Sequence, residues 1–308
     1  MELTRHLLGT TGLSVSSVCI GTSPLGSIPR LYGYEVAADQ AIATVRAALH
    51  GPFNFIDTSN AYGDGESERR IGEALKDAGG LPEDFVLATK VDPDPETGDF
   101  SGDRVRASLE ESLERLGVDR LQLLYLHDPE RISFAEATSA QGAVPALVAL
   151  KEQGLVDHIG VAGGPIDVLM DYVNTGVFEV VLTHNRYTLI DQTAGPLLRE
   201  AARRGIGVVN AAPYGGGMLV KGPQVQPVYA YRRDEEATRQ KALRMQALCE
   251  GFGVPLAAAA LQFSVREPLI ASTAVGVSSA DRIEQTRRLL EHEVPEALWQ
   301  QLDVVASL

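Results

Sequence analysis

The sequence is poor in cysteine, in positive charge and in long apolar runs, and each shortage excludes a class of protein. Only two of its 308 residues are cysteines, too few for a disulfide framework, so we expect a protein of the reducing cytoplasm. Lys and Arg total 27 against 41 Asp and Glu, which argues against a nucleic-acid partner because phosphate binding needs a basic surface. No apolar run reaches the ~20 residues of a membrane span, and the N-terminus lacks the features of a signal peptide.

Several catalytic motifs are also missing. No G-x-G-x-x-G follows the first apolar run, so the Rossmann pyrophosphate loop is absent. The chain has no G-x-S-x-G turn for a serine nucleophile, and no H-E-x-x-H or C-x-x-C for zinc. We therefore predict neither a serine hydrolase nor a metal site.

What the chain does contain is an alternation of short apolar runs with helical stretches. The apolar runs are almost continuous rather than alternating, which is typical of a parallel sheet covered by helices. No Pro/Gly/Ser-rich linker interrupts them, so we predict an α/β fold with one domain over residues 1–308, a single (β/α)8 TIM barrel. The predicted strands are 15–21, 53–57, 85–90, 121–127, 157–163, 178–184, 206–211 and 269–276, and the predicted helices include 37–50, 66–78, 104–117, 143–154, 194–205 and 236–253.

Two further features complete this barrel. The segment "HLLGTTGLSV" has glycine-centred turn chemistry and predicts an N-terminal β-hairpin that closes the bottom. Residues 93–103 and 215–236 are longer than simple connections and follow predicted strands. They are therefore expected on the C-terminal face, where barrel active sites lie.

Polar residues stand where three of the predicted strands end. Asp57, Lys90 and His127 end the second, third and fourth strands, and Tyr62 follows the second. A buried lysine needs a carboxylate partner, and a lysine beside a tyrosine favours the phenolate, which suits proton transfer. A histidine on the same rim can hold a substrate oxygen. An ordinary ion pair with two polar rim residues is the alternative, and the coincidence of all four residues favours a catalytic site.

Four segments resemble the aldo-keto reductase superfamily over nearly the whole chain, in the same order: "GTTGLSVSSVCIGTSPLG", "FIDTSNAYGDGESERRIGEAL", "FVLATK" and "LHDPE". The resemblance implies hydride transfer with a nicotinamide dinucleotide bound in extended form at the barrel mouth. By the same resemblance, Tyr62 is the general acid/base, Lys90 tunes it and Asp57 pairs with Lys90. His127 then orients the carbonyl or alcohol.

The resemblance also places the cofactor, with departures. Ala162 and Gly163 stand where a Ser-Asn pair is usual, His184 replaces a glutamine and Ala211 a stacking tyrosine, so the nicotinamide amide is expected to be held differently, by His184 and Asn185. Backbone amides at Gly215–Gly217 are expected to approach the pyrophosphate, unless that stretch is a flexible loop. The predicted cofactor contacts are Gly21, Thr22, Asp57, Ala162, Gly163, His184, Ala211, Pro213, Gly215, Gly217, Gly276, Ser278, Ser279 and Arg282.

The segment expected at the adenosine end of the cofactor carries little positive charge. Relatives that use NADP commonly have a basic residue early in this segment, whereas residues 276–279 carry none and Arg282 follows. Phosphate recognition rests on charge-assisted hydrogen bonds. We therefore expect NAD to be preferred over NADP.

"LHDPE", "NAAPYGGGML" and the segment 260–283 resemble a subgroup that includes L-fucose or D-threo-aldose 1-dehydrogenases, plant L-galactose dehydrogenase and pyridoxal 4-dehydrogenase. This resemblance implies oxidation of the hemiacetal hydroxyl of an aldose to a lactone. The expected substrate contacts are Tyr62, His127, Asp128 and Tyr229, unless the loop around Tyr229, Tyr231 and Arg232 closes on itself. Three alternatives stay open: a pyridoxal 4-dehydrogenase, a general NADPH-dependent reductase of aldehydes and ketones, and a non-catalytic cofactor-sensing subunit like those of potassium channels.

Overall fold

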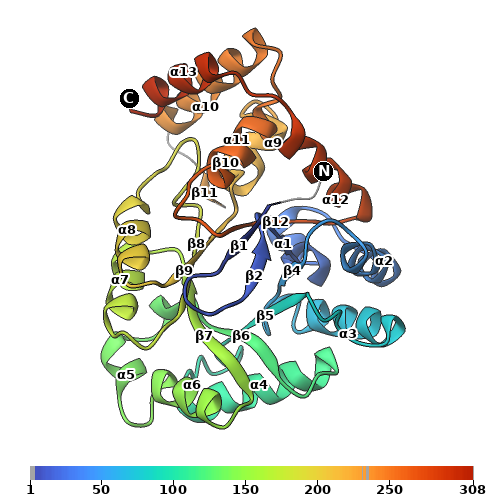
Figure 1. Cartoon of the computed structure of the whole chain (residues 1–308), viewed down its shortest axis with the longest axis vertical. Coiled ribbons are helices and arrows are strands. Elements are labelled where there is room, and N and C mark those ends of the chain that lie inside the picture. Colours follow the sequence, from blue (N-terminus) through green and yellow to red (C-terminus); the bar gives the residue numbers. More distant parts are fainter. Residues whose placement is uncertain (1–3, 231, 234–235, 308) are drawn as a thin grey trace.

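Eight parallel strands close into a barrel, in the order β12-β3-β4-β5-β6-β7-β8-β9 (Figure 1). The computed structural model describes residues 4–230, 232–233 and 236–307. The barrel confirms the predicted (β/α)8 fold. Its strands are β3 (Val18–Gly21), β4 (Phe55–Asp57), β5 (Val86–Val91), β6 (Leu121–His127), β7 (Val156–Gly163), β8 (Val180–His184), β9 (Gly207–Ala211) and β12 (Ser272–Gly276).

Helices surround the barrel and continue into an outlying C-terminal group that contains α10 and α13 (Figure 1). The α-helices are α1 (Pro29–Tyr32), α2 (Ala38–Leu49), α3 (Glu66–Ala78), α4 (Gly102–Leu116), α5 (Phe134–Thr138), α6 (Ala143–Glu152), α7 (Ile166–Asn174), α8 (Gly195–Arg203), α9 (Met218–Lys221), α10 (Glu236–Gly251), α11 (Leu256–Val265), α12 (Ala280–Glu291) and α13 (Glu296–Ala306). The short 3₁₀ turns are η1 (Ser23–Gly26), η2 (Pro129–Arg131) and η3 (Gly215–Gly217), and β10 (Val228–Tyr229) pairs with β11 (Arg232–Arg233).

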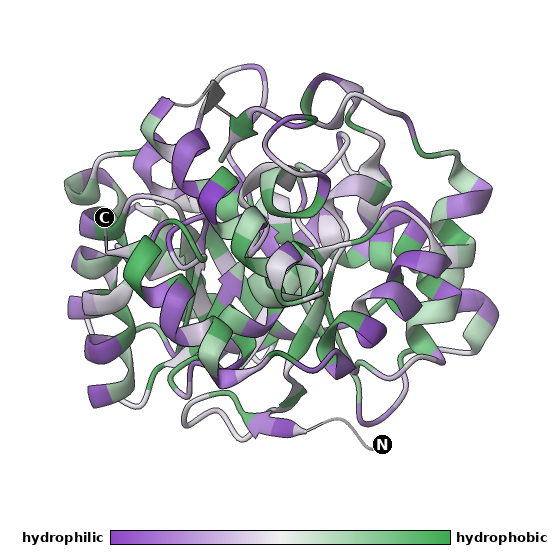
Figure 2. Ribbon diagram, turned by 90° about the horizontal axis from the view of Figure 1, so that it is seen from above, coloured by the Kyte–Doolittle hydropathy of each residue, from purple (hydrophilic) through white to green (hydrophobic). Residues whose placement is uncertain are grey.

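An antiparallel hairpin, β1 (Arg5–Leu7) with β2 (Ser14–Ser16), lies below the barrel next to the N-terminus, as predicted (Figure 2). Leu8 and Val15 are fully buried in the apolar cluster that fills the barrel. At Gly9 the backbone is left-handed and a β-carbon would come within 2.3 Å of the Gly207 nitrogen, so only glycine fits this approach. The prediction of one strand over 15–21 was wrong, because the structure divides this run between β2 and β3.

The strands carry their side chains in layers because successive residues of a strand face opposite sides. Phe55, Ala88 and Tyr125 belong to the apolar cluster inside the barrel. Asp57, Lys90 and His127 each follow one of these residues by two positions. The same face of each strand therefore carries an apolar layer and then a polar layer at its carboxyl end.

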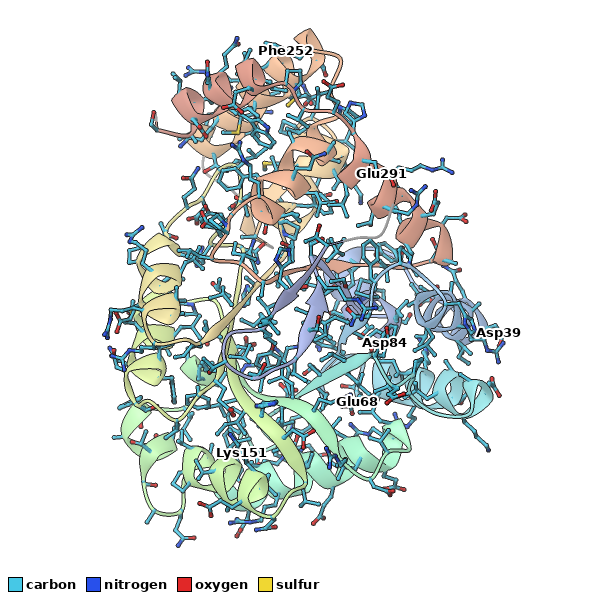
Figure 3. All side chains as sticks on the ribbon, in the orientation of Figure 1. Asp39, Glu68, Asp84, Lys151, Phe252 and Glu291 are labelled. Carbon is cyan, nitrogen blue, oxygen red and sulfur yellow. The ribbon has the colours of Figure 1, made fainter. Side chains whose placement is uncertain are left out.

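The loops on the C-terminal face and the outlying helices complete the structure. The predicted long segments follow β5 and β9, and a third, over residues 22–37, follows β3 and contains η1 and α1. Figure 3 shows side chains packed between the C-terminal helices, where Leu298, Trp299 and Leu302 of α13 join a second core with α10 and α11. No single helix in the described residues is long and apolar enough to cross a membrane, and α10 and α11 pass that test only as a pair bent by 103°.

Candidate active site

Lys90 is the centre of the polar layer. Its side chain is 1% exposed, and its Nζ donates to Oδ1 of Asp57 at 2.7 Å and to the carbonyl of Thr58 at 2.5 Å. The Tyr62 hydroxyl lies 3.2 Å from the same Nζ. The apolar layer below offers no compensation for a charge, so the ion pair with Asp57 is what allows the ammonium to be buried here. The structure thus brings together three of the four residues predicted from the strand ends.

The loop that carries Tyr62 has a sequence suited to its path. Three consecutive residues, Gly63, Asp64 and Gly65, adopt left-handed backbone, and a β-carbon on Gly63 would come within 2.0 Å of the Gly26 carbonyl oxygen. The glycines of "YGDGE" therefore let the chain reverse immediately after Tyr62 while it contacts the loop after β3. Tyr62 is half-buried and its ring lies edge-on to His127, with ring centroids 5.9 Å apart.

A buried ion pair stabilises the loop that carries Tyr62. Glu68 of α3 is fully buried, accepts from the Thr89 hydroxyl at 2.6 Å and pairs with Arg115 of α4 at 3.2 Å (Figure 3 labels Glu68). Arg115 also donates to the backbone carbonyl of Asn60 at 3.1 Å. Burial raises the pKa of Glu68, against the hydrogen bonds and charge of its partners. The network ties the Tyr62 loop to α3, α4 and β5.

His127 is held by a carboxylate that the sequence analysis did not single out. Asp92 follows β5, is 1% exposed, and its Oδ1 lies 2.7 Å from Nδ1 of His127. Burial acts to raise the pKa of Asp92, but the charge and hydrogen bond of His127 outweigh it, so the pKa lies below its ordinary value. Burial acts to lower the pKa of His127, but the carboxylates of Asp92 and Asp128 outweigh it, so this pKa lies above its ordinary value.

Asp128 lies between two imidazoles at the rim. Its Oδ1 is 3.7 Å from Nε2 of His127 and 3.8 Å from Nε2 of His184, and its Oδ2 accepts from Arg131 at 3.0 Å. Burial acts to raise the pKa of Asp128, but the charge of His127, the hydrogen bond from His184 and the charge of Arg131 outweigh it and hold the pKa far below its ordinary value. The result is a partly exposed carboxylate beside the polar layer, able to accept hydrogen bonds from hydroxyl groups.

The residues predicted to contact the cofactor lie at the carboxyl ends of neighbouring strands. Gly21 pairs with Gly276 and Asp57, and His184 pairs with Ala211. The Thr22 hydroxyl is already used, because it donates to the Asp57 carbonyl at 2.9 Å. The remaining predicted residues follow the ends of β7, β9 and β12 or stand at them, and they are Ala162, Gly163, Pro213, Gly215, Gly217, Ser278, Ser279 and Arg282.

The buried polar atoms that have no hydrogen-bond partner among the described residues include Oδ1 of Asn185, directly after β8, and the hydroxyl of Tyr214, in the turn after β9. Asn185 follows β8 with left-handed backbone, and its amide nitrogen contacts Nδ1 of His184 at 3.1 Å. A β-carbon on Gly164 would lie 2.9 Å from the His184 ring, so the glycine makes room for it. The unpaired carbonyl oxygen fits a carboxamide ligand such as that of nicotinamide, because a buried acceptor is costly unless it is bonded.

The glycine turn after β9 is built around Tyr229. The backbone is left-handed at Gly215, Gly216 and Gly217, and a β-carbon on Gly215 would come within 2.2 Å of the Tyr229 ring. The Gly215 and Gly217 amides donate to the carbonyls of Ala212 and Tyr214, so local turn formation already uses them. Tyr229 is 8% exposed and its hydroxyl lies 2.8 Å from that of Thr188. Tyr229 therefore supports the turn, its contact with substrate stays a prediction, and Tyr231 lies outside the described residues.

No group of three or more His, Cys, Asp or Glu residues within the described ranges could hold a metal ion. Cys19 and Cys249 are both buried. The chemistry available at the rim is that of Lys90, Tyr62, His127 and their carboxylate partners.

Comparison with known proteins places the chain in a family. It is 38% identical to L-galactose dehydrogenase of Arabidopsis thaliana over 92% of this chain and 87% of that protein. It is 31% identical to D-threo-aldose 1-dehydrogenase of a Pseudomonas species, covering 98% and 97% of the two chains, and 28% identical to pyridoxal 4-dehydrogenase of Microbacterium luteolum, covering 96% and 95%. The holo form of an aldo-keto reductase from Bacillus halodurans has the same fold, with a TM-score of 0.80, 23% identity and coverage of 99% and 96%. Residues 17–307 match the Aldo/keto reductase family, and the chain therefore belongs to this family of NAD(P)-dependent oxidoreductases that act on CH–OH donors.

Proposed function

We propose that the protein is an aldose dehydrogenase, which oxidises the hemiacetal hydroxyl of an aldopyranose such as L-galactose or L-fucose to a lactone. The observation that carries the proposal is the buried Lys90, bonded to Asp57 and 3.2 Å from the Tyr62 hydroxyl, on a chain 38% identical to an L-galactose dehydrogenase. Bound NAD(P) supplies the hydride acceptor. The protein's own residues bind the sugar, orient its hydroxyl and take up the proton.

In this proposal Tyr62 is the general acid/base. The Lys90 ammonium lies 4.8 Å from the centroid of the tyrosine ring and favours the phenolate, which accepts the hydroxyl proton during oxidation. Asp57 holds Lys90 in place and compensates its charge. His127 binds the reacting oxygen from the other side, so that Tyr62 and His127 together fix its position.

Polar groups around this centre support a polyhydroxylated substrate. Asp128 keeps a charged carboxylate at the rim between His127 and His184, where it can accept hydrogen bonds from the hydroxyls adjacent to the reacting carbon. A substrate with a single carbonyl and no hydroxyls would leave this carboxylate without a ligand partner. We therefore favour a sugar over a simple aldehyde.

For the cofactor we propose that NAD is preferred over NADP. Gly276 is exposed at the end of β12, and Ser278 and Ser279 precede α12 without a cation. Arg282 is exposed and its guanidinium already donates to Gln285 at 2.7 Å. We assign the unpaired Oδ1 of Asn185 and the ring of His184 to the nicotinamide amide, and the loops after β3, β9 and β12 to the rest of the cofactor.

A nicotinamide absorbance assay with product identification tests the proposal. L-galactose, L-fucose, a D-threo-aldose, pyridoxal and a set of open-chain aldehydes would each be offered with NAD and with NADP. A lactone from an aldose, formed faster with NAD, is the expected result. A lactone from pyridoxal alone, or an alcohol from open-chain aldehydes with no lactone from any sugar, would contradict it.

A further inference from the structure

Asp92 is a fully buried carboxylate to which the proposed reaction gives no role. It follows β5 two residues after Lys90 and therefore lies on the same side of the strand. Its Oδ1 faces Nδ1 of His127 at 2.7 Å, and its Oδ2 accepts from the Ala61 amide at 3.0 Å and from the Ser59 hydroxyl. Every polar atom of this carboxylate is occupied.

The contact determines which nitrogen of His127 carries a proton. Asp92 is ionised, because the charge of His127 and the two donors at Oδ2 outweigh burial and hold its pKa below the ordinary value, and an ionised carboxylate can only accept. Nδ1 of His127 must therefore be the donor. Ser59 agrees with this assignment, because its hydroxyl donates to Asp92 and leaves an oxygen lone pair 3.1 Å from the same Nδ1.

We propose that Asp92 is a positioning residue that accepts a hydrogen bond from Nδ1–H of His127 and keeps that proton on Nδ1, so that His127 can donate from Nε2 to the substrate oxygen only as an imidazolium. The inference rests on the proposed function and adds to it. A neutral ring with its proton on Nδ1 offers a lone pair at Nε2. That lone pair would compete with Tyr62 for the hydroxyl proton of the substrate instead of supporting the developing carbonyl oxygen.

The charges around His127 determine the pH range over which its imidazolium form exists. Asp92 and Asp128 face the ring with negative charge, whereas the Lys90 ammonium acts against its protonation. Behind the carboxylates, Arg104 donates to the Asp92 carbonyl and Arg131 pairs with Asp128. Two carboxylates against one ammonium favour the cationic form of His127 beside Tyr62, and that cation in turn favours the tyrosine phenolate.

The variant Asp92→Asn reverses the tautomer for a geometric reason. The two donors at the Oδ2 position, Ser59 and the Ala61 amide, select the amide oxygen of the asparagine for that position. The NH2 group must then face Nδ1 of His127 and donate to it. The neutral ring would carry its proton on Nε2 and remain a donor to the substrate at any pH, but without charge.

Nuclear magnetic resonance of the protein labelled with 15N-histidine tests this without substrate. The chain has six histidines, and His127→Gln identifies the signal of interest. As the pH rises, the wild type should lose the Nε2 proton and keep the Nδ1 proton, whereas Asp92→Asn should show a neutral ring protonated on Nε2. Glu96→Gln, an exposed carboxylate on the same loop, is the matched control and should leave the His127 signals unchanged.

Activity provides the second measurement. We expect a falling alkaline limb in the pH profile of wild-type kcat/KM for the alcohol, which Asp92→Asn should lack while its maximum is at least tenfold lower. A neutral wild-type ring protonated on Nε2 would overturn the inference, even if Asp92→Asn failed to fold. A neutral His127 ring that keeps its proton on Nδ1 in Asp92→Asn would also overturn the inference. If the tautomers are as expected but the protein oxidises no sugar, the proposed function is contradicted and the inference about Asp92 is not.

Discussion

The carboxyl edge of the barrel has two halves that satisfy their polar groups in different ways. Along β4, β5 and β6 the ionisable groups proposed to react are paired within the protein, Lys90 with Asp57 and His127 with Asp92, and only the second oxygen of the Asp57 carboxylate lacks a partner among the described residues of this acid/base group. Along β8 and β9, the buried Oδ1 of Asn185 and hydroxyl of Tyr214 have no partner among the residues that the structure describes. The first half is preorganised for chemistry, and the second half leaves hydrogen bonds for a ligand to make.

The two halves also differ in side-chain size. Lys90, Tyr62 and His127 fill the edge on the first half. Ala162 and Ala211 stand at comparable positions on the second, near the ends of β7 and β9, with the ring of His184 at the end of β8 between them. A flat cofactor needs room, and an acid/base group needs a fixed position. The distribution of large and small side chains therefore matches an edge on which one half carries the reacting groups and the other half binds the cofactor.

The sharpest test of the first half is to remove its proton-transfer atom. Tyr62→Phe should lower turnover by ~10²–10⁴-fold, since general acid–base catalysis contributes about that much. Lys90→Met should cause a comparable loss, because the charge that favours the phenolate disappears. Cofactor affinity, measured by calorimetric titration, should stay nearly unchanged in Tyr62→Phe. Turnover close to wild type would show that this half does not carry the proton.

Removing the charge of Asp92 from the first half should lower the free energy of unfolding by an amount that depends on pH. The lowered pKa of Asp92 gives stability that is present above the unfolded value of 3.8 and lost as the pH falls through the folded pKa. The raised pKa of His127 gives stability that is present below the unfolded value of 6.5 and lost as the pH rises through the folded pKa. The pair is therefore strongest between these two values.

Asp92→Asn should accordingly lower the free energy of unfolding by ~1–3 kcal/mol within that window, a typical cost for a buried charged hydrogen bond. The deficit should shrink at more acidic and more alkaline pH. Urea denaturation over a pH series measures it, with Glu96→Gln, an exposed carboxylate on the same loop, as the control. A deficit independent of pH would mean that Asp92 contributes packing and not charge.

The first half was largely predictable from the sequence, because parallel strands end on one edge. Asp57, Lys90 and His127 could be found from strand ends alone. Asp92 was missed although it carries a signal: it follows Lys90 by two residues, and alternation places both side chains on the same face. Its partner on β6 is distant in sequence, so only the closed barrel brings the two together.

The rest of the fold was harder to predict for local reasons. The run 15–21 reads as one strand, but hydrogen bonds between Ser16 and Asn54 end the hairpin where β2 stops, and β3 begins at Val18. The contact of Tyr229 with substrate stays a prediction, but the burial of this side chain against the glycine turn was not foreseen. Its burial depends on the missing β-carbon of Gly215, a contact that no sequence period reveals.

The second half can be tested by adding a charge at its adenosine end. Ser279→Arg, before α12, should strengthen NADP binding about tenfold, because a charge-assisted hydrogen bond at a partly exposed site contributes ~1.4 kcal/mol. Gly276 is a poorer position, since a β-carbon there would lie 3.3 Å from Pro24. Titration of both cofactors measures the change, and Ser139→Arg, outside the proposed site, controls for net charge. Wild-type protein that binds NADP tenfold tighter than NAD would contradict the assignment.

The smallest expected effect concerns the unpaired oxygen of Asn185. Its backbone is left-handed with φ of 59°, so Asn185→Gly removes the side chain without adding strain. Loss of one hydrogen bond to the nicotinamide amide should weaken cofactor binding by ~1 kcal/mol, or about fivefold. Ala212→Gly, at the next left-handed position along this edge, is the matched control and should leave binding unchanged. Equal losses in both variants would trace the effect to backbone freedom, and unchanged binding in Asn185→Gly would show that the oxygen is not reserved for the cofactor.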